Sequence, residues 1–207
     1  MSETTDRQRQ TIDAATDLFR RHGYGKTTMA DIARASSMSR PTLYSEFPDK
    51  DAVFAAVLES MTASLLADIE RAVRECHTLR SQVERACALW VLTGYELVRH
   101  NPDAADLFDA RFPAVQASNR AFEDFLTELF DHGVPTAPEL EPRRLAEMIS
   151  LSLQGIKKHA RTRPHLDDLI NTLTAAACTA VTATDLTIST TNQNLGDTTQ
   201  QDRSTTQ

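Results

Sequence analysis

The sequence predicts an all-α protein, in which three N-terminal helices precede a bundle of further helices. Two observations support this fold class. Apolar residues recur at helical spacing in one segment after another, and no segment shows the sustained period-two alternation of a strand. In addition, only six glycines occur in 207 residues, which argues against a sheet rich in hairpins.

The first predicted helix has an apolar face and a glycine at its end. Ile12, Ala15, Leu18 and Phe19 follow helical spacing. Gly23 is typical of the residue that follows a helix C-terminus.

Polar residues mark the starts of the next two helices. Thr28 is a typical N-cap, and Asp31 suits the positive end of the second helix. Ser39 is a typical N-cap for a short third helix. Pro41 fits the first turn of that helix, because its missing N–H would have no helical partner there. These signals predict two short helices joined by a tight turn.

The rest of the chain is divided by prolines and other start signals. Six helical segments are expected to begin at or near Asp49, Leu79, Pro102, Pro113, Pro142 and Pro164. Residues 134–141 contain two prolines and are predicted to form a loop. Residues 189–207 contain Leu195 as their only large apolar residue and are predicted to be disordered. We expect domains at 1–48 and 49–188, followed by a tail at 189–207.

The charge distribution is uneven along a chain whose net charge is −7. Residues 1–50 carry eight Lys or Arg against seven Asp or Glu, and residues 20–50 carry six against three. The remainder is acidic. Basic charge is thus concentrated around the predicted short helices, where a nucleic-acid surface would lie.

Several classes of protein are not indicated. The three cysteines lack CxxC spacing and nearby histidine pairs, which argues against a zinc site or a disulfide framework and favours a reducing compartment. No nucleophile–base constellation, metal-ligand spacing or phosphate loop occurs, so we expect no enzyme activity, no metal and no cofactor. Residues 1–10 are polar, unlike a signal peptide, and no apolar run approaches the length of a membrane span. We expect a cytoplasmic protein with no membrane partner.

The segment from Thr27 to Lys50 has the layout of a helix-turn-helix, in which the second helix of the pair enters the DNA major groove. Ile32, Ala33, Leu43 and Phe47 would pack the helices together. This leaves hydroxyl groups and an arginine on the exposed side of the short helix, which suits contacts to phosphates and base edges.

The same segment resembles the TetR family signature. The matching runs are Thr27–Ala33, Ser39–Phe47 and Lys50, within a region of similarity over about residues 11–58. The resemblance implies a DNA-binding regulator with a helical domain for effector binding and dimerisation after residue 49.

The resemblance also implies roles for individual residues. Thr28 would contact a phosphate, although Thr28 and Ser39 can also be helix caps alone. Arg40 would read a guanine, Pro41 would touch a thymine methyl group, and Lys50 would contact the DNA backbone. The full expected DNA-binding set is Thr28, Ser37, Ser39, Arg40, Pro41, Thr42, Tyr44 and Lys50.

The chain departs from the family pattern at two places. Ser37 occupies the turn position that is usually glycine, and a left-handed backbone there would cost roughly 1 kcal/mol. Ser45 and Glu46 follow the tyrosine where the family often has an aromatic residue or histidine. A solvated carboxylate at the end of the helix is the simpler interpretation of Glu46.

The helix that begins at Pro142 is apolar on two faces, as is typical of a helix that covers its own core and a second subunit. Small residues there and in the last helix would permit close approach. A helix buried within one subunit is the alternative. The predicted interface comprises Leu145, Ile149, Ser152, Ile156, Leu169, Leu173 and Ala177.

An effector pocket is predicted among the central helices, where aromatic residues cluster. Its expected lining is Trp90, Tyr95, Phe108, Phe112, Phe122 and Phe125, although each of these is also typical of plain core. The resemblance to the TetR family implies a homodimeric repressor that binds a pseudopalindromic double-stranded operator and is released by a small apolar or amphipathic effector. The alternative is a regulator controlled by a partner or by cysteine oxidation, or an activator.

Overall fold

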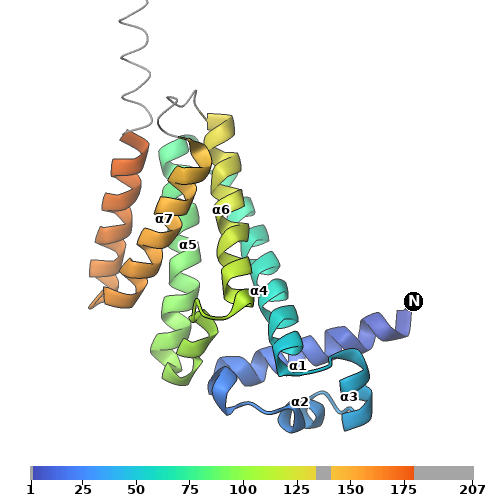
Figure 1. The fold of residues 1–207 in the computed structure, drawn as a ribbon. Coiled ribbons are helices and arrows are strands. Elements are labelled where there is room, and N and C mark those ends of the chain that lie inside the picture. Colours follow the sequence, from blue (N-terminus) through green and yellow to red (C-terminus); the bar gives the residue numbers. More distant parts are fainter. Residues whose placement is uncertain (1, 134–140, 180–207) are drawn as a thin grey trace, which may run out of the picture. The chain divides into compact units, whose positions relative to one another are not determined.

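The computed structural model of the protein describes residues 2–133 and 141–179 (Figure 1). Within these ranges all regular structure is helical, which confirms the predicted fold class. The elements are α1 (Ser2–Lys26), α2 (Met29–Ala35), α3 (Arg40–Glu46), α4 (Lys50–Val73), α5 (Leu79–His100), the 3-10 helix η1 (Pro102–Phe108), α6 (Pro113–Gly133), α7 (Pro142–His159) and a helix over 163–179.

The predicted starts at Leu79, Pro102, Pro113 and Pro142 are confirmed by these bounds. Asp49 is the N-cap of α4, where its carboxylate accepts a hydrogen bond from the Ala52 amide at 2.8 Å. The predicted tail at 189–207 and most of the predicted loop at 134–141 lie outside the described residues.

The chain divides into two compact units, and two of the boundaries between them fall inside helices α5 and α6. The first unit comprises residues 1–75 and 88–122, and the second comprises residues 76–87 and 123–207. The helix-turn-helix therefore shares a unit with α4, η1 and parts of α5 and α6. The boundary at residue 48 stays a prediction about function.

Gly23 breaks α1 near its C-terminal end, as predicted from the sequence. Its φ of 73° and ψ of 171° lie in a region that is almost restricted to glycine. A Cβ atom at this position would lie 2.1 Å from the backbone oxygen of Asp103 in η1. The site therefore demands glycine for its backbone conformation and also for the close approach of η1.

The core of the first unit lies where α1, the short helices and α4 meet. Phe19, Ile32, Leu43 and Phe54 are buried there. Aromatic rings extend this core, because Tyr24 and Phe54 lie 4.8 and 5.2 Å, respectively, from the Phe112 ring. The packing confirms that Leu43 is a core residue.

Among the described residues, α4 is the one helix long and apolar enough to cross a membrane by length and composition alone. This corrects the expectation that no apolar run approaches a membrane span. Val53, Phe54, Val57 and Leu58 of α4 are buried in the core of the first unit. A core helix of a globular domain meets the same criterion, so α4 is weak evidence for a membrane.

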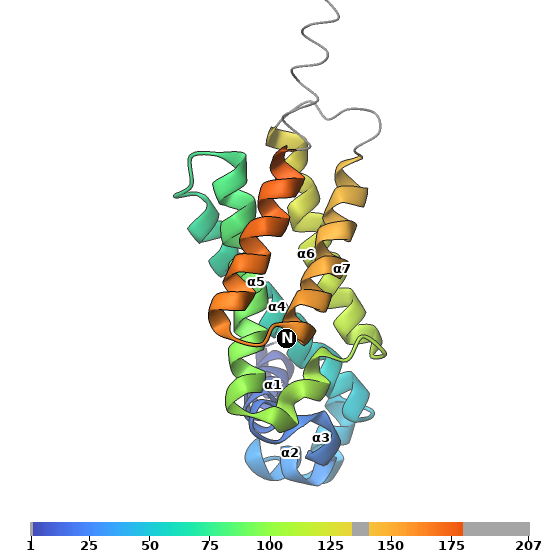
Figure 2. The same cartoon turned by 90° about the vertical axis from the view of Figure 1, so that its left-hand side faces the viewer.

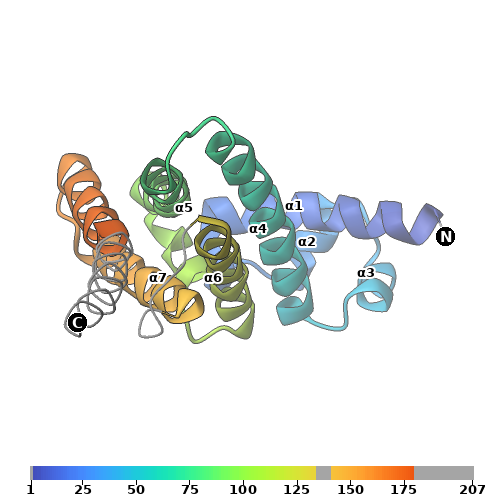
Figure 3. The same cartoon turned by 90° about the horizontal axis from the view of Figure 1, so that it is seen from above.

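In the second unit, α7 and the helix over 163–179 run antiparallel, side by side (Figures 2 and 3). Leu145, Ile149 and Leu153 of α7 are buried, as are Leu166 and Ile170 of the last helix. Both helices therefore bury one apolar stripe inside a single copy of the chain.

Candidate DNA-binding site

The short helices α2 and α3 are held at an angle by a shared core. Ile32 of α2 and Leu43 of α3 are fully buried, and Phe47 at the end of α3 is 7% exposed. With its inner face packed in this way, α3 presents the opposite face to solvent.

Both predicted N-caps are confirmed. The Thr28 hydroxyl accepts a hydrogen bond from the Asp31 amide at 3.2 Å, and the Asp31 carboxylate accepts one from the Thr28 amide at 3.1 Å. This reciprocal capping box fixes the start of α2. Hydrogen bonds from the Thr28 hydroxyl and amide also hold the pKa of Asp31 below its usual value. Ser39 caps α3 by accepting from the Thr42 amide at 3.3 Å.

The turn between α2 and α3 contains the predicted left-handed residue. Ser37 has a φ of 54°, the one positive φ among the described residues other than glycine. The Met38 amide donates to the Ala33 carbonyl at 2.9 Å, so the backbone closes over the end of α2. Ser37 therefore adopts the conformation that glycine would adopt without a steric penalty.

The structure brings the predicted recognition residues together on α3 and its cap. Ser39, Arg40, Pro41 and Tyr44 are exposed, and half of the Tyr44 surface is accessible. Thr42 is half-buried, with its hydroxyl 2.8 Å from that of Ser39. A guanidinium group, a phenol and hydroxyl groups on one short exposed helix are suited to reading base edges and phosphates.

Lys50 has an intramolecular role that the sequence did not indicate. Its Nζ donates to the carbonyl oxygens of Tyr24 at 2.9 Å and Thr27 at 3.0 Å, and lies 3.9 Å from the centroid of the Tyr24 ring. An ammonium group has three N–H donors, so one remains for a phosphate. Lys50 thus fixes the segment that leads into Thr28, in addition to its predicted contact with DNA.

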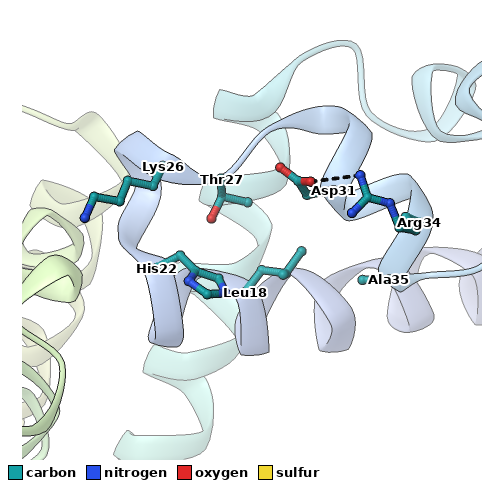
Figure 4. Close-up of a pocket in the computed structure, with 7 residues that line it drawn as sticks. All are labelled: Leu18, His22, Lys26, Thr27, Asp31, Arg34 and Ala35. Carbon is teal, nitrogen blue, oxygen red and sulfur yellow. Dashed lines mark hydrogen bonds and ion pairs between the residues drawn. The ribbon is translucent and has the colours of Figure 1, made fainter.

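A hollow of about 390 Å³ lies beside the helix-turn-helix, between α1 and α2 (Figure 4). Its lining comprises Leu18, His22, Lys26, Thr27, Asp31, Arg34 and Ala35. Lys26 pairs with Asp103 at 2.7 Å and Arg34 with Asp31 at 3.2 Å. These pairs leave the hollow without a dominant charge, and it does not coincide with the predicted effector pocket.

The aromatic residues predicted for that pocket have different environments. Phe108 and Phe112 pack against the core around α1 and α4, so we assign them to that core rather than to a pocket. Trp90 and Phe122 stack with centroids 4.4 Å apart. Tyr95 is half-buried in the first unit, and Phe125 is half-buried in the second. For these four residues, a role in effector binding stays a prediction.

The predicted dimer interface needs a correction. Leu145, Ile149 and Ala177 are at most 4% exposed inside one copy, so they cannot form a surface for a second copy. Ser152, Ile156, Leu169 and Leu173 are half-buried. The exposed apolar side chains of α7 are instead Met148 and Leu151, at 50% and 59%. Helical spacing predicted two apolar faces but did not indicate which of them packs into the core of the chain.

The buried thiols are poorly suited to chemistry. Burial, followed by the nearby Cys178, raises the pKa of Cys87 to about 12. Burial also raises the pKa of Cys178. Since the thiolate is the reactive form, both groups are protonated and slow to react at neutral pH.

Two capped helices joined by a tight turn, with an exposed polar face on the second, define a helix-turn-helix DNA-binding protein. The profile of the family described as "Bacterial regulatory proteins, tetR family" matches residues 12–57, which include the whole helix-turn-helix. The helix-turn-helix of this chain is that of the TetR family of transcriptional regulators. This family is one of regulators rather than enzymes, which confirms the prediction of a protein without enzyme activity.

Similar proteins extend the match beyond the helix-turn-helix. The chain is 27% identical over 178 residues to the HTH-type transcriptional repressor ComR of Escherichia coli (strain K12), covering 77% of this chain and 81% of ComR. The FadR regulator of Bacillus subtilis, solved in complex with stearoyl-CoA, is similar with a TM-score of 0.63 and 14% identity, covering 84% of this chain and 98% of FadR. AibR, solved with isovaleryl coenzyme A and operator DNA, gives a TM-score of 0.56 and 16% identity, covering 82% of this chain and 97% of AibR.

Proposed function

We propose that the chain is a cytoplasmic repressor that binds a pseudopalindromic operator as a homodimer. A small amphipathic effector releases the repressor from its operator. The observation that carries the proposal is the exposed face of α3, where Arg40 and Tyr44 are accessible to solvent on the same short helix that Ser39 caps. The similarity to the repressor ComR supports repression.

On DNA, Arg40 reads a base edge, and Thr28 and Lys50 contact phosphates. A dimer places two copies of α3 about 34 Å apart, one turn of DNA. The exposed Met148 and Leu151 on α7 support dimerisation through this helix, because two large apolar side chains gain from being covered.

The effector class that we propose is an acyl-coenzyme A thioester. The support is that FadR and AibR, which share the fold, were solved with such thioesters. An effector that prefers the DNA-free conformation weakens DNA binding by the same factor as DNA weakens effector binding. Control by oxidation of Cys87 or Cys178 is less well supported, because both side chains are buried and their thiol pKa values are raised.

Footprinting on the DNA that flanks the gene for this chain tests the DNA-binding part. We expect protection of two half-sites about one helical turn apart. Arg40→Ala relaxes specificity at one base position, whereas Lys26→Ala, which removes a cation outside α3, leaves specificity unchanged. Equal sequence preference of wild-type protein and Arg40→Ala would refute the assigned role of α3.

Displacement of the footprinted duplex tests the effector. Short- and long-chain acyl-CoA thioesters are added at a range of concentrations, with free coenzyme A as the control. We expect one chain length to raise the melting temperature of the protein and to release the duplex. Equal affinity of that thioester for free and DNA-bound protein would contradict release by an effector.

A further inference from the structure

The segment Gly23–Thr27, which leads from α1 into α2, is bound by a carboxylate from η1. Asp106 accepts hydrogen bonds from two consecutive amides, Tyr24 at 2.9 Å and Gly25 at 2.8 Å, through its two carboxylate oxygens. A carboxylate that accepts two backbone N–H groups makes charge-assisted bonds, which are about twice as strong as neutral ones.

These two amides need an external acceptor because of Gly23. The backbone of Gly23 departs from helical φ and ψ, so the amides that follow it are the unpaired donors of a new helical turn. The absence of a side chain on Gly23 also lets η1 approach closely, since a Cβ there would lie 2.8 Å from the Asp106 carboxylate. Gly23 thus leaves the Tyr24 and Gly25 amides without a helical acceptor and also provides the space for the Asp106 carboxylate.

The same segment is held from its carbonyl side by α4. Lys50 donates to the Tyr24 and Thr27 carbonyl oxygens, so an anion and a cation bind opposite ends of the peptide groups in one short segment. Thr27 is buried, and its hydroxyl donates to the Gly23 carbonyl at 2.8 Å. Thr28, the cap of α2, comes next in the chain. Its position is therefore set by groups on η1 and α4.

We propose that Asp106 is a positioning residue for DNA binding, which acts by fixing the Gly23–Thr27 segment and thereby Thr28 and the start of α2. The proposal rests on the proposed phosphate contact of Thr28. Asp106 lies outside residues 12–57, the segment that matches the family profile. It touches no DNA in this scheme, and its effect passes through the backbone of residues 24 and 25.

The sign of the effect separates positioning from electrostatics. Removing a negative charge from a DNA-binding unit strengthens DNA binding if charge alone matters. Loss of the Asp106 carboxylate is expected to weaken it. Asp103 provides a matched control on the same helix, because its carboxylate pairs with the exposed Lys26 side chain and with no backbone amide that the structure describes.

The experiment compares Asp106→Asn, Asp106→Glu and Asp103→Asn in the full chain. The probe is a duplex that the wild-type protein selects from a random 30-base-pair library, with a mixed-sequence duplex as a non-specific probe. Affinities are measured at one salt concentration, at a temperature where circular dichroism shows each variant to be folded. Hydrogen exchange of the Tyr24 and Gly25 amides is followed without DNA.

We expect Asp106→Asn to bind both duplexes about tenfold more weakly. The Gly23–Thr27 segment positions Thr28, whose proposed phosphate contact is the same on both duplexes. Asp103→Asn should bind as wild type or slightly better. The Tyr24 and Gly25 amides should exchange at least tenfold faster in Asp106→Asn alone. Partial recovery of affinity in Asp106→Glu, which retains the charge and both oxygens on a longer side chain, would attribute the loss in Asp106→Asn to the missing carboxylate.

Equal affinities of folded Asp106→Asn and Asp103→Asn would overturn the proposal. If Asp106→Asn fails to fold, Asp106→Glu decides, and wild-type affinity together with fast exchange of the two amides would count against a positioning role. A wild-type protein that selects no duplex refutes the proposed function instead. In that case the exchange rates still show whether Asp106 holds the segment.

Discussion

The helix-turn-helix and the α7 region are both helical, but they are specified in different ways. In residues 23–50, single residues with particular backbone or hydrogen-bonding properties decide each junction, including Gly23, Thr28, Ser37 and Ser39. In α7 and the helix over 163–179, burial of apolar stripes decides the arrangement. Recognition of DNA needs a few side chains at fixed positions, whereas a packed helix pair accepts many apolar combinations.

The largest expected difference between the two regions concerns glycine. Gly23→Ala should lower the free energy of unfolding by about 3 kcal/mol, since it adds backbone strain and a clash with Asp103. Gly155→Ala in α7 meets no atom within 4 Å and should raise it by about 0.5–1 kcal/mol through helix propensity. Urea titrations at one protein concentration measure both changes. Similar losses from the two substitutions would show that the regions are not specified differently.

The second expected effect concerns the exposed face of α7. If this face pairs with a second copy, Leu151→Gln should raise the dimer dissociation constant at least about tenfold, because covering a leucine contributes about 1.5–3 kcal/mol and 1.4 kcal/mol is a factor of ten. Sedimentation equilibrium checks this change. Arg143→Gln, an exposed position elsewhere on α7, is the control and should leave self-association unchanged. A Leu151→Gln protein that dimerises like wild type would remove α7 from the proposed interface.

A smaller effect is expected at the turn of the helix-turn-helix. Ser37→Gly should raise the free energy of unfolding by up to about 1 kcal/mol, because glycine removes the strain of a φ of 54°. Ser37→Ala keeps the strain and should give no gain. Denaturant midpoints of the two variants provide the comparison. A gain from alanine equal to that from glycine would point to a cause other than backbone conformation.

The smallest expected effect is a pH dependence around Tyr24. Burial, followed by the hydrogen bond that its hydroxyl donates to Asp51, raises the pKa of Tyr24 from 10.0 to about 12. The folded state therefore retains a proton that the unfolded state loses, so this stabilisation is complete below pH 10 and disappears as the pH rises through 12. Tyr24→Phe should reduce the alkaline slope of stability relative to the wild-type protein. Unfolding free energies at several alkaline pH values measure the slopes, and equal slopes for the two proteins would contradict the assignment.

Local signals in the sequence predicted much of the DNA-binding region. Caps at Thr28, Ser39 and Asp49, the helix end at Gly23 and the left-handed Ser37 all depend on neighbours within a few residues, and all are present in the structure. Contacts between distant residues were missed. The bonds from Asp106 to Tyr24 and Gly25 span more than 80 positions, and an aspartate in a polar segment carries no local mark of such a role.

The α7 region shows a second limit of sequence patterns. Leu145 and Ile149 on one side and Met148 and Leu151 on the other are equally apolar, so periodicity gave two candidate faces. Only the three-dimensional packing of the chain buries the first pair and exposes the second.

The bond between Asp106 and the segment after Gly23 has a consequence for hybrid regulators. Engineers who wish to give a sensor domain a new operator exchange helix-turn-helix segments between relatives, and residues 12–57 would be the natural graft from this chain. Such a graft leaves its acceptor for the Tyr24 and Gly25 amides behind in the donor protein. A hybrid that also receives η1, Pro102–Phe108, keeps both hydrogen bonds between Asp106 and the Tyr24 and Gly25 amides.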